Sequence, residues 1–251
     1  MNPSLPASVD DPSQWLGPTA LVDPECPRLR LKAQSIAQHG RTEREKVLAL
    51  YGAVKRIPFG KPIKLRLRTG KEVLEAEHAD AEDKATLLTA MLRSQGFPAR
   101  LQYVELHGEI LRGLTRAISS AARPVLQVWM DGRWAATDTY IFDAHYAAAA
   151  RMRLRERAWD WGYGMHRCGH TLWSGHEDAF LTGDATTTAE VSLGQLGLFH
   201  DPEAFAGVYR EGLPRVGRAM RWNMLAPGMH RAVQDLRTMK PVPQAAPRGA
   251  T

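Results

Sequence analysis

The sequence predicts an α+β protein in which helices pack against an antiparallel sheet. Two segments have the caps and apolar spacing of helices, an Asp-Gly turn separates two apolar runs, and the pattern after residue 143 is mostly helical. A chain of 251 residues with 44% hydrophobic content can bury a sizeable core. No window approaches the roughly 18 continuous apolar residues of a membrane span, and the N-terminus lacks a signal-peptide pattern, so we expect a soluble, cytoplasmic protein.

The two predicted helices carry the clearest local signals. Thr42 and Glu45 form a capping-box pattern, so we expect a helix over residues 42–56. Asp80 can cap the second helix, and Gly96 ends it. We expect the second helix to face the core with four apolar residues, Leu87, Leu88, Met91 and Leu92.

Extended structure is predicted at three places. A strand should follow the second helix at residues 99–106. Residues 124–130 and 133–138 should pair across the dipeptide Asp-Gly at 131–132, which tolerates the positive φ of a tight turn. Apolar and basic residues alternate over residues 63–68, which indicates an extended segment with one buried apolar face and one basic face; the alternative is an ordinary solvated edge.

Composition and periodicity divide the chain into four parts. Pro, Ser and Asp dominate its start, and an alanine run at 147–150 leads into an arginine-rich helix and then a Gly/His/Trp-rich loop. Further helices are expected near residues 201–211 and 228–239. The predicted parts are an N-terminal arm (1–22), a core domain (23–142), a helical C-terminal extension (143–240) and a disordered tail (241–251).

Two blocks of sequence follow longer motifs. Residues 80–100 (DAEDKATLLTAMLRSQGFPAR) match a pattern in which Gly-Asp-Cys opens a helix that ends in Leu-Arg-x-x-Gly-Ile-Pro-Ala-Arg. Residues 127–139 (QVWMDGRWAATDT) match a hairpin of the form Glu-Val-Tyr-x-Asp-Gly-Arg-Trp-x-x-x-Asp-Pro-Thr. Both blocks resemble the transglutaminase-like, papain-related superfamily, and the resemblance extends over residues 15–140. It implies a core in which the helix at the nucleophile position packs on an antiparallel sheet, as in small bacterial members.

The resemblance also implies a position for each catalytic residue of the family. A cysteine at the helix start is the nucleophile, a histidine beginning the hairpin is its base, and an aspartate orients that histidine. These positions fall on Ala81, Arg123 and Asp138. Alanine has no nucleophilic atom, and an arginine guanidinium, which stays protonated at neutral pH, cannot accept a proton. We therefore expect no thiol-dependent transglutaminase or protease activity, and the second replacement favours natural divergence over a laboratory Cys→Ala change.

Acidic residues beside Ala81 suggest an alternative chemistry. Asp80, Glu82 and Asp83, with His78 just before the helix, could act as acid/base groups in a reaction that needs no thiol. The structural alternative is that acidic residues in a first helical turn cap the helix and complement its dipole.

The segment from His166 to His176 concentrates three histidines and one cysteine. His166, Cys168, His170 and His176 could ligate zinc, or Cys168 could be a relocated nucleophile paired with His166 or His170. Histidines that pack a loop and a cysteine that fills space are the structural alternative, which we favour, so no cofactor is expected. Cys26 and Cys168 alone do not indicate a disulfide framework.

The charge of the chain bears on its ligands. A net charge of +6 and a pI near 9.5 favour anionic partners, but no nucleic-acid motif accompanies the widely spread basic residues. Arg123 could pair with Asp138 or bind a substrate carboxylate or phosphate, and Trp129 and Tyr140 could line a cleft or belong to the core. Residues that could add positive potential, or form a solvated face, are Lys61, Lys64, Arg66, Arg68 and Lys71.

Three classes of function follow from these observations. The leading hypothesis is a non-canonical pseudoenzyme that uses the old cleft to bind a peptide, an acyl group or a small anionic ligand. The second is an enzyme with displaced chemistry, such as cysteine-free acyl transfer or cyclisation, in which the fold supplies orientation. The third is a partner-binding scaffold. A desolvated carboxylate or a converged His/Cys cluster would favour an enzyme, and a filled cleft would favour a scaffold.

Overall fold

The computed structural model describes residues 11–209 and 215–238 of the chain. The main sheet has four strands in the order β3-β2-β1-β6, with antiparallel neighbours, and β4 pairs with β5 in a separate two-stranded ribbon. The strands are β1 (Ala99–His107), β2 (Ser120–Met130), β3 (Arg133–Thr137), β4 (Trp161–Gly162), β5 (Met165–His166) and β6 (Ser192–Phe199). The fold is α+β with an antiparallel sheet, as the sequence predicts.

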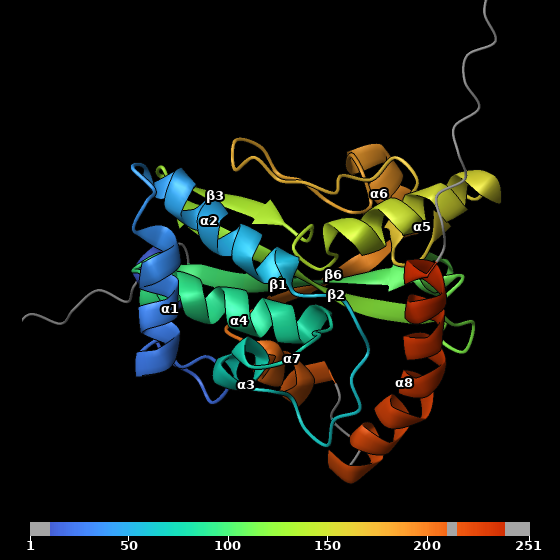
Figure 1. Ribbon diagram of the computed structural model, residues 1–251, viewed down its shortest axis with the longest axis horizontal. Coiled ribbons are helices and arrows are strands. Elements are labelled where there is room, and N and C mark those ends of the chain that lie inside the picture. Colours follow the sequence, from blue (N-terminus) through green and yellow to red (C-terminus); the bar gives the residue numbers. More distant parts are fainter. Residues whose placement is uncertain (1–10, 210–214, 239–251) are drawn as a thin grey trace, which may run out of the picture.

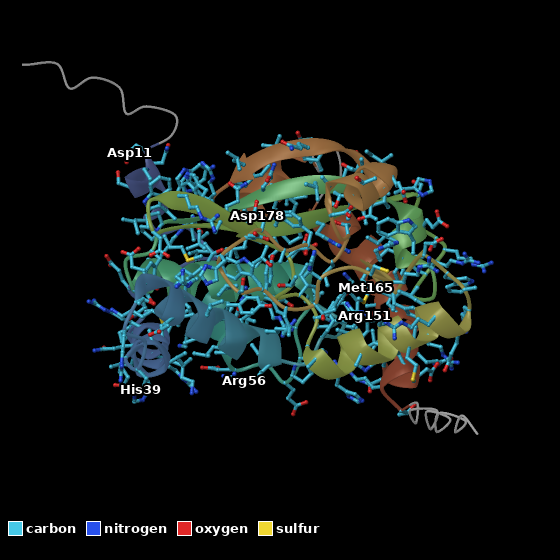
Figure 2. All side chains as sticks on the ribbon, turned by 90° about the horizontal axis from the view of Figure 1, so that it is seen from above. Asp11, His39, Arg56, Arg151, Met165 and Asp178 are labelled. Atoms are coloured by element: carbon cyan, nitrogen blue, oxygen red, sulfur yellow. The ribbon has the colours of Figure 1, made fainter. Side chains whose placement is uncertain are left out.

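Helices surround this sheet. Figure 1 shows α1 and α8 at opposite ends of the long axis of the molecule. In Figure 2, His39, which follows α1, and Arg56, the last residue of α2, lie along one edge, away from the strands. Among the helices of the described residues, none is long and apolar enough to cross a membrane. The helices are η1 (Pro12–Trp15), α1 (Pro27–Ala37), α2 (Glu43–Arg56), α3 (Gly70–Leu74), α4 (Ala81–Ser94), η2 (Gly108–Leu111), α5 (Ala144–Glu156), α6 (Ala185–Val191), α7 (Pro202–Tyr209) and α8 (Arg215–Arg237).

The helix α4 lies in the interior, where it packs against α1, α2 and α3 and against β1 and β2. Its first turn is a capping box, since the Asp80 side chain accepts from the Asp83 amide and the Asp83 side chain accepts from the Asp80 amide. Every residue from Glu82 to Arg93 is buried. Gly96 follows with a φ of +83°, a conformation that favours glycine. The helix predicted to begin at Asp80 and to end by Gly96 is confirmed.

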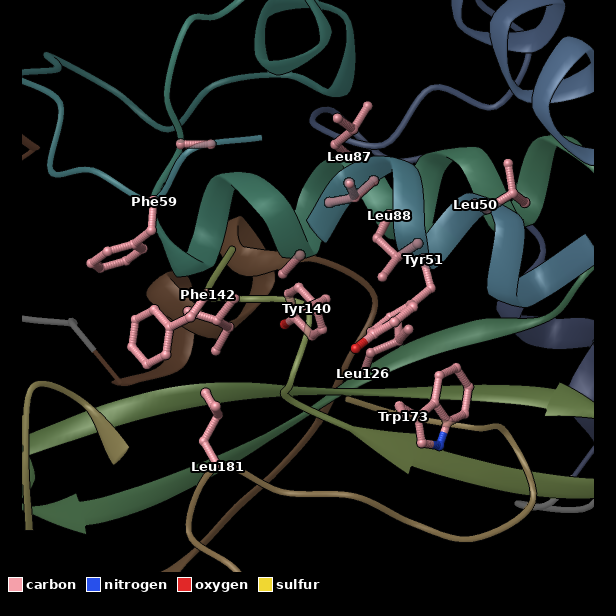
Figure 3. Close-up of a cluster of buried hydrophobic side chains, with 14 of the residues drawn as sticks. Leu50, Tyr51, Phe59, Leu87, Leu88, Leu126, Tyr140, Phe142, Trp173 and Leu181 are labelled. Atoms are coloured by element: carbon pink, nitrogen blue, oxygen red, sulfur yellow. The ribbon is translucent and has the colours of Figure 1, made fainter. Parts of the chain in front are cut away.

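The main hydrophobic core lies between α4, α2 and the sheet. Tyr51 of α2 lies beside Leu126 of β2, and Leu50 of α2 and Leu87 and Leu88 of α4 belong to the same cluster (Figure 3). Burial of each such side chain contributes about 1.5–3 kcal/mol relative to exposure. The predicted core residues of α4 are exposed by 1% or less; they are Leu87, Leu88, Met91 and Leu92.

The predicted hairpin is formed by β2 and β3. Asp131 and Gly132 connect the strands with φ values of +50° and +76°, the left-handed conformation that tight hairpin turns require. β2 begins at Ser120 rather than at the expected residue 124 because it pairs with β1 as far as His107. Strand length is therefore set here by the partner strand.

The segment over residues 63–68 differs from its prediction. Ile63 and Leu65 are 70% and 84% exposed, whereas the side chains of Lys64 and Arg68 bind carboxylates at the start of α4. The segment also forms no strand. The prediction of a buried apolar face was wrong, because the partners that bury this segment are charged rather than apolar.

The C-terminal part is mostly helical and also supplies one strand that the pattern does not predict. α7 corresponds to the helix expected near residues 201–211, and α8 includes most of the one expected near 228–239 but begins earlier. β6 pairs with β1 at an edge of the main sheet. The predicted tail at 241–251 and the first ten residues of the arm lie outside the described residues.

Candidate functional site

Arg123 and Asp138 form a buried ion pair on the hairpin. Arg123 lies in β2 opposite Val104, and Asp138 directly follows β3. Arg123 Nη1 donates to Asp138 Oδ2 at 3.0 Å, and Arg123 Nη2 donates to the Gly164 carbonyl at 2.6 Å. Arg123 is 8% exposed and Asp138 is 1% exposed. The structure thus brings together two of the three positions that the resemblance assigns to catalysis.

The carboxylate of Asp138 has a partner at each oxygen. Besides Arg123, it accepts a hydrogen bond from the Leu181 amide at Oδ1, at 2.7 Å. Burial raises the pKa of Asp138, while the guanidinium of Arg123 and the Leu181 amide act in the opposite direction. The group is desolvated, but its hydrogen-bonding capacity is used within the protein.

The two aromatic candidates lie in different environments. Tyr140 is fully buried, and its hydroxyl donates to the Pro124 carbonyl at 2.8 Å. Burial, together with the charge of Asp138, raises the pKa of Tyr140 well above its ordinary value. Trp129 packs edge-on against Trp134 across the hairpin, with ring centroids 5.6 Å apart. Tyr140 is therefore a core residue, and Trp129 forms a cross-strand pair of the kind that stabilises sheets.

Ala81 is the first residue of α4. It is partly exposed between the buried residues Asp80 and Glu82, and it packs against the core. Its helix packs against β2, the strand that carries Arg123. The position that the resemblance assigns to the nucleophile therefore lies at the start of a buried helix next to the hairpin.

A network of buried charges covers the start of α4. Lys64 Nζ lies 2.9 Å from a carboxylate oxygen of Asp80 and from one of Asp83, and Arg68 also binds Asp83. Burial opposes ionisation of Asp80, but Lys64 and Lys61 keep its pKa below the ordinary value. Burial and the neighbouring Asp80 raise the pKa of Asp83, and burial lowers the pKa of Lys61 to about 8. These contacts support the structural alternative for two of the three candidate acids, Asp80 and Asp83.

His78 lies beside α8. Its ring centroid is 5.5 Å from that of His230, and its carbonyl accepts a hydrogen bond from Arg68. Burial lowers the pKa of His78, and the nearby His230 and Arg68 add to this effect. A lowered pKa keeps the imidazole neutral at about pH 7.

Two buried lysines near Ala81 were not predicted from the sequence. Lys84 is fully buried, and its Nζ lies 3.3 Å from the Lys55 carbonyl and 3.4 Å from the Tyr140 carbonyl. Lys55 Nζ donates to the Thr139 and Phe142 carbonyls at 2.6 and 2.7 Å. Burial lowers the pKa of Lys84 to about 7 and that of Lys55 to about 8. The lysines hold the turn after Asp138, and the sequence signal for Lys84 was its helical spacing from Leu88.

The histidine-rich segment does not converge on one point. The Cys168 amide donates to His166 Nδ1 at 3.3 Å, whereas His176 lies near Arg44, with a nitrogen separation of 3.4 Å. Cys168 is exposed, and it forms no disulfide with Cys26. Within residues 11–209 and 215–238, no three His, Cys, Asp or Glu side chains gather as a metal site would require.

The start of α4 and the hairpin together define a papain-like α+β protein. Residues 30–139 match the family model described as the transglutaminase-like superfamily, and this match supports the assignment of that part of the chain to the superfamily. No curated protein matches the chain. A solved structure titled "a Putative Cysteine Protease from Cytophaga hutchinsonii" is 17% identical, with a TM-score of 0.40, and the match covers 52% of this chain and 40% of the other.

Proposed function

We propose that this chain is a non-canonical member of the superfamily that performs no thiol-dependent acyl transfer and acts by binding. By the family correspondence, the nucleophile position holds Ala81 and the base position holds Arg123. A methyl group cannot attack a carbonyl, and a guanidinium cannot accept the proton that activates a nucleophile.

The observation that carries this proposal is the engagement of Arg123. Its two terminal nitrogens donate to Asp138 and to the Gly164 carbonyl, and the pair is buried. A buried ion pair whose charged groups both have partners within the protein supports a structural bridge rather than a reactive centre. Because these donors are occupied, a peptide, acyl or small anionic ligand in the old cleft would bind beside the partly exposed Ala81 rather than on Arg123.

An alkylation experiment tests the loss of thiol chemistry. Transamidation and hydrolysis of an activated acyl ester would be measured for the full chain with and without iodoacetamide, and for Cys168→Ala, with Cys26→Ala as the matched control. We expect no iodoacetamide-sensitive activity in any of the three proteins. Activity that is lost on alkylation and in Cys168→Ala, but kept in Cys26→Ala, would establish a relocated nucleophile and overturn the proposal.

A partner-binding scaffold is a second candidate, favoured by exposed apolar side chains near the start of α4. Ile63 and Leu65 are largely exposed, and Met224 of α8 is 73% exposed. The Lys64 amide donates to Asn223 Oδ1 at 3.0 Å, so these side chains lie on one surface. Clustered exposed apolar residues mark interaction sites. Sedimentation velocity of the parent and of Leu65→Ser would show whether the surface mediates self-association.

A further inference from the structure

The connection between β1 and β2 forms a hollow of about 410 Å³. Its base is closed by a hydrogen bond from the Gly108 amide to the Ser119 carbonyl, at 2.7 Å. A side chain at position 108 would lie 2.1 Å from the Ile118 carbonyl oxygen, so only glycine permits this approach. The polar residues around the hollow are His107, Glu109, Arg112, Thr115, Arg116 and Ser119.

The two arginines of this hollow have no carboxylate partner in the part of the chain that the structure describes. Among the described residues, no carboxylate lies within ion-pair distance of the Arg112 or Arg116 guanidinium. Lys64, Arg68 and Arg123, in contrast, each pair with a buried carboxylate. Arg112 instead lies 3.7 Å from the Trp159 ring, and Arg157 lies 4.6 Å from the same ring. The hollow is therefore lined by two arginines and by one carboxylate, that of Glu109, and Arg157 also contacts Trp159.

Backbone contacts hold one side of the hollow in place. The Tyr163 amide donates to the Arg112 carbonyl at 2.8 Å, and the Gly164 amide donates to the Ile110 carbonyl at 2.7 Å. The Gly164 carbonyl in turn accepts from Arg123. Arg112 is therefore ordered before any ligand arrives, which lowers the entropy that binding would cost.

We infer that this hollow binds the phosphate group of a small hydroxylated molecule, such as a sugar phosphate. Guanidinium groups bind phosphate oxygens through paired N–H donors, and the Thr115 and Ser119 hydroxyls can donate to a third oxygen. The hollow is within the roughly 300–1,000 Å³ range of small-molecule sites, so it holds more than a phosphate ion. Glu109 can accept from ligand hydroxyl groups. The site is separate from the Arg123–Asp138 pair and does not depend on the function proposed for that pair.

Calorimetric titration of the full chain tests this inference. The probes are inorganic phosphate, ribose 5-phosphate, ribose and acetate. Ribose 5-phosphate should bind more tightly than inorganic phosphate, and ribose and acetate should bind poorly. Arg112→Gln and Arg116→Gln should each weaken ribose 5-phosphate binding about tenfold, since each removes one charge-assisted contact. Arg56→Gln, an equal charge change at the end of α2 (Figure 2), should leave binding unchanged.

Three results would overturn the inference. They are equal binding by all four proteins, acetate binding as tight as phosphate binding, and no binding of ribose 5-phosphate at millimolar concentrations. Circular dichroism would establish that each variant is folded. Arg116 is exposed, so Arg116→Gln remains informative even where Arg112→Gln, which loses its contact with Trp159, destabilises the chain.

Discussion

Arg123 makes two contacts at once that a neutral histidine could not make. A neutral imidazole has one N–H donor, whereas a guanidinium has five in a planar fork. Arg123 uses this fork to hold both Asp138 and the Gly164 carbonyl. Arginine at this position therefore both holds Asp138 and joins the hairpin to the segment that carries β4 and β5, which a neutral histidine could not do with a single donor.

The proposed loss of catalysis predicts how it can be restored. Ala81→Cys should alkylate readily, because the helix dipole favours a thiolate at this position, but it should turn over poorly because Arg123 cannot act as a base. Adding Arg123→His should supply the base, with Asp138 available to orient it. The double mutant should hydrolyse an activated acyl ester ~10²–10⁴-fold faster than Ala81→Cys.

The parent, both single mutants and the double mutant would be compared at equal folded concentration. Equal hydrolysis in all four would mean that the cleft differs from the family beyond positions 81 and 123. A single Ala81→Cys mutant that matches the double mutant would show that Arg123 does not occupy the base position.

Lys84 predicts a specific dependence of stability on pH. Its pKa is about 7 in the folded chain against 10.5 ordinarily, so between these values the unfolded chain holds the extra proton. The free energy of unfolding should therefore rise with pH across this window, by up to about 1.4 kcal/mol per pH unit from this group. Lys84→Met should remove that part of the slope and stabilise the protein most at about pH 7.

Urea unfolding at several values between about pH 7 and pH 10 measures this slope. Lys32→Met, at an exposed position of α1, is the matched control and should keep the slope of the parent. Parallel slopes for Lys84→Met and the parent would contradict the assignment.

At the scale of elements, α8 packs Met229, Val233 and Leu236 into the core, and its last residue adds polar contacts. Arg237 donates to Asp143 Oδ1 at 3.1 Å and to the Phe59 carbonyl at 3.1 Å. Asp143 also caps α5 by accepting from the Tyr146 amide, and it accepts from the Phe59 amide. One carboxylate thus joins α5, α8 and the segment after α2.

Removal of the Arg237 guanidinium should loosen α8 selectively. Arg237→Ala should cost about 1–3 kcal/mol, because it deletes charge-assisted hydrogen bonds and leaves Asp143 with amide partners alone. Hydrogen exchange should accelerate in α8 and little in β1 or β2. Arg231→Ala, at an exposed position of the same helix, should leave exchange unchanged. Equal acceleration in the sheet would mean that α8 and the core unfold together.

The elements show which parts of the fold local sequence can predict. The hairpin and α4 were predicted because Asp131-Gly132 and the Asp80 cap act within a few residues. The orientation of residues 63–68 was not predicted correctly, because an alternating pattern defines two faces but does not show which face lies against the interior. The pairing of Arg123 with Asp138 was one of the options that the motif left open. Lys55 and Lys84 were missed because their partners are distant backbone carbonyls.

At the scale of the molecule, β6 closes one edge of the sheet from far along the chain. It pairs with β1, about ninety residues earlier, and Phe199 at its end contacts the Tyr103 ring edge-on at 5.8 Å. The register shifts twice, between Tyr103 and Val104 and between Glu105 and Leu106. Such a pairing has no local sequence signal, because bulges interrupt the alternation that identifies strands.

A chain that ends at residue 191 should therefore fail to form the native sheet. Without β6, the β1 edge would lack its partner, and Tyr103 would lose the rings of Phe199 and Phe205, the latter stacked on it at 3.7 Å. We expect the truncated chain to bind the dye ANS and to associate at micromolar concentration, as exposed strand edges do. Cooperative melting of a monomeric truncated chain would contradict this expectation.

The late position of β6 in the sequence also determines when the sheet can be completed during synthesis. β1 ends at His107 and its partner is complete only at Phe199, so 199 − 107 = 92 residues are added in between. At ~5–20 residues per second, translation takes about 5–18 s over that interval. β2 can pair with one side of β1 early in this period, while the other side waits for β6. The nascent chain is thus most vulnerable to association with its neighbours on the polysome before β6 leaves the ribosome.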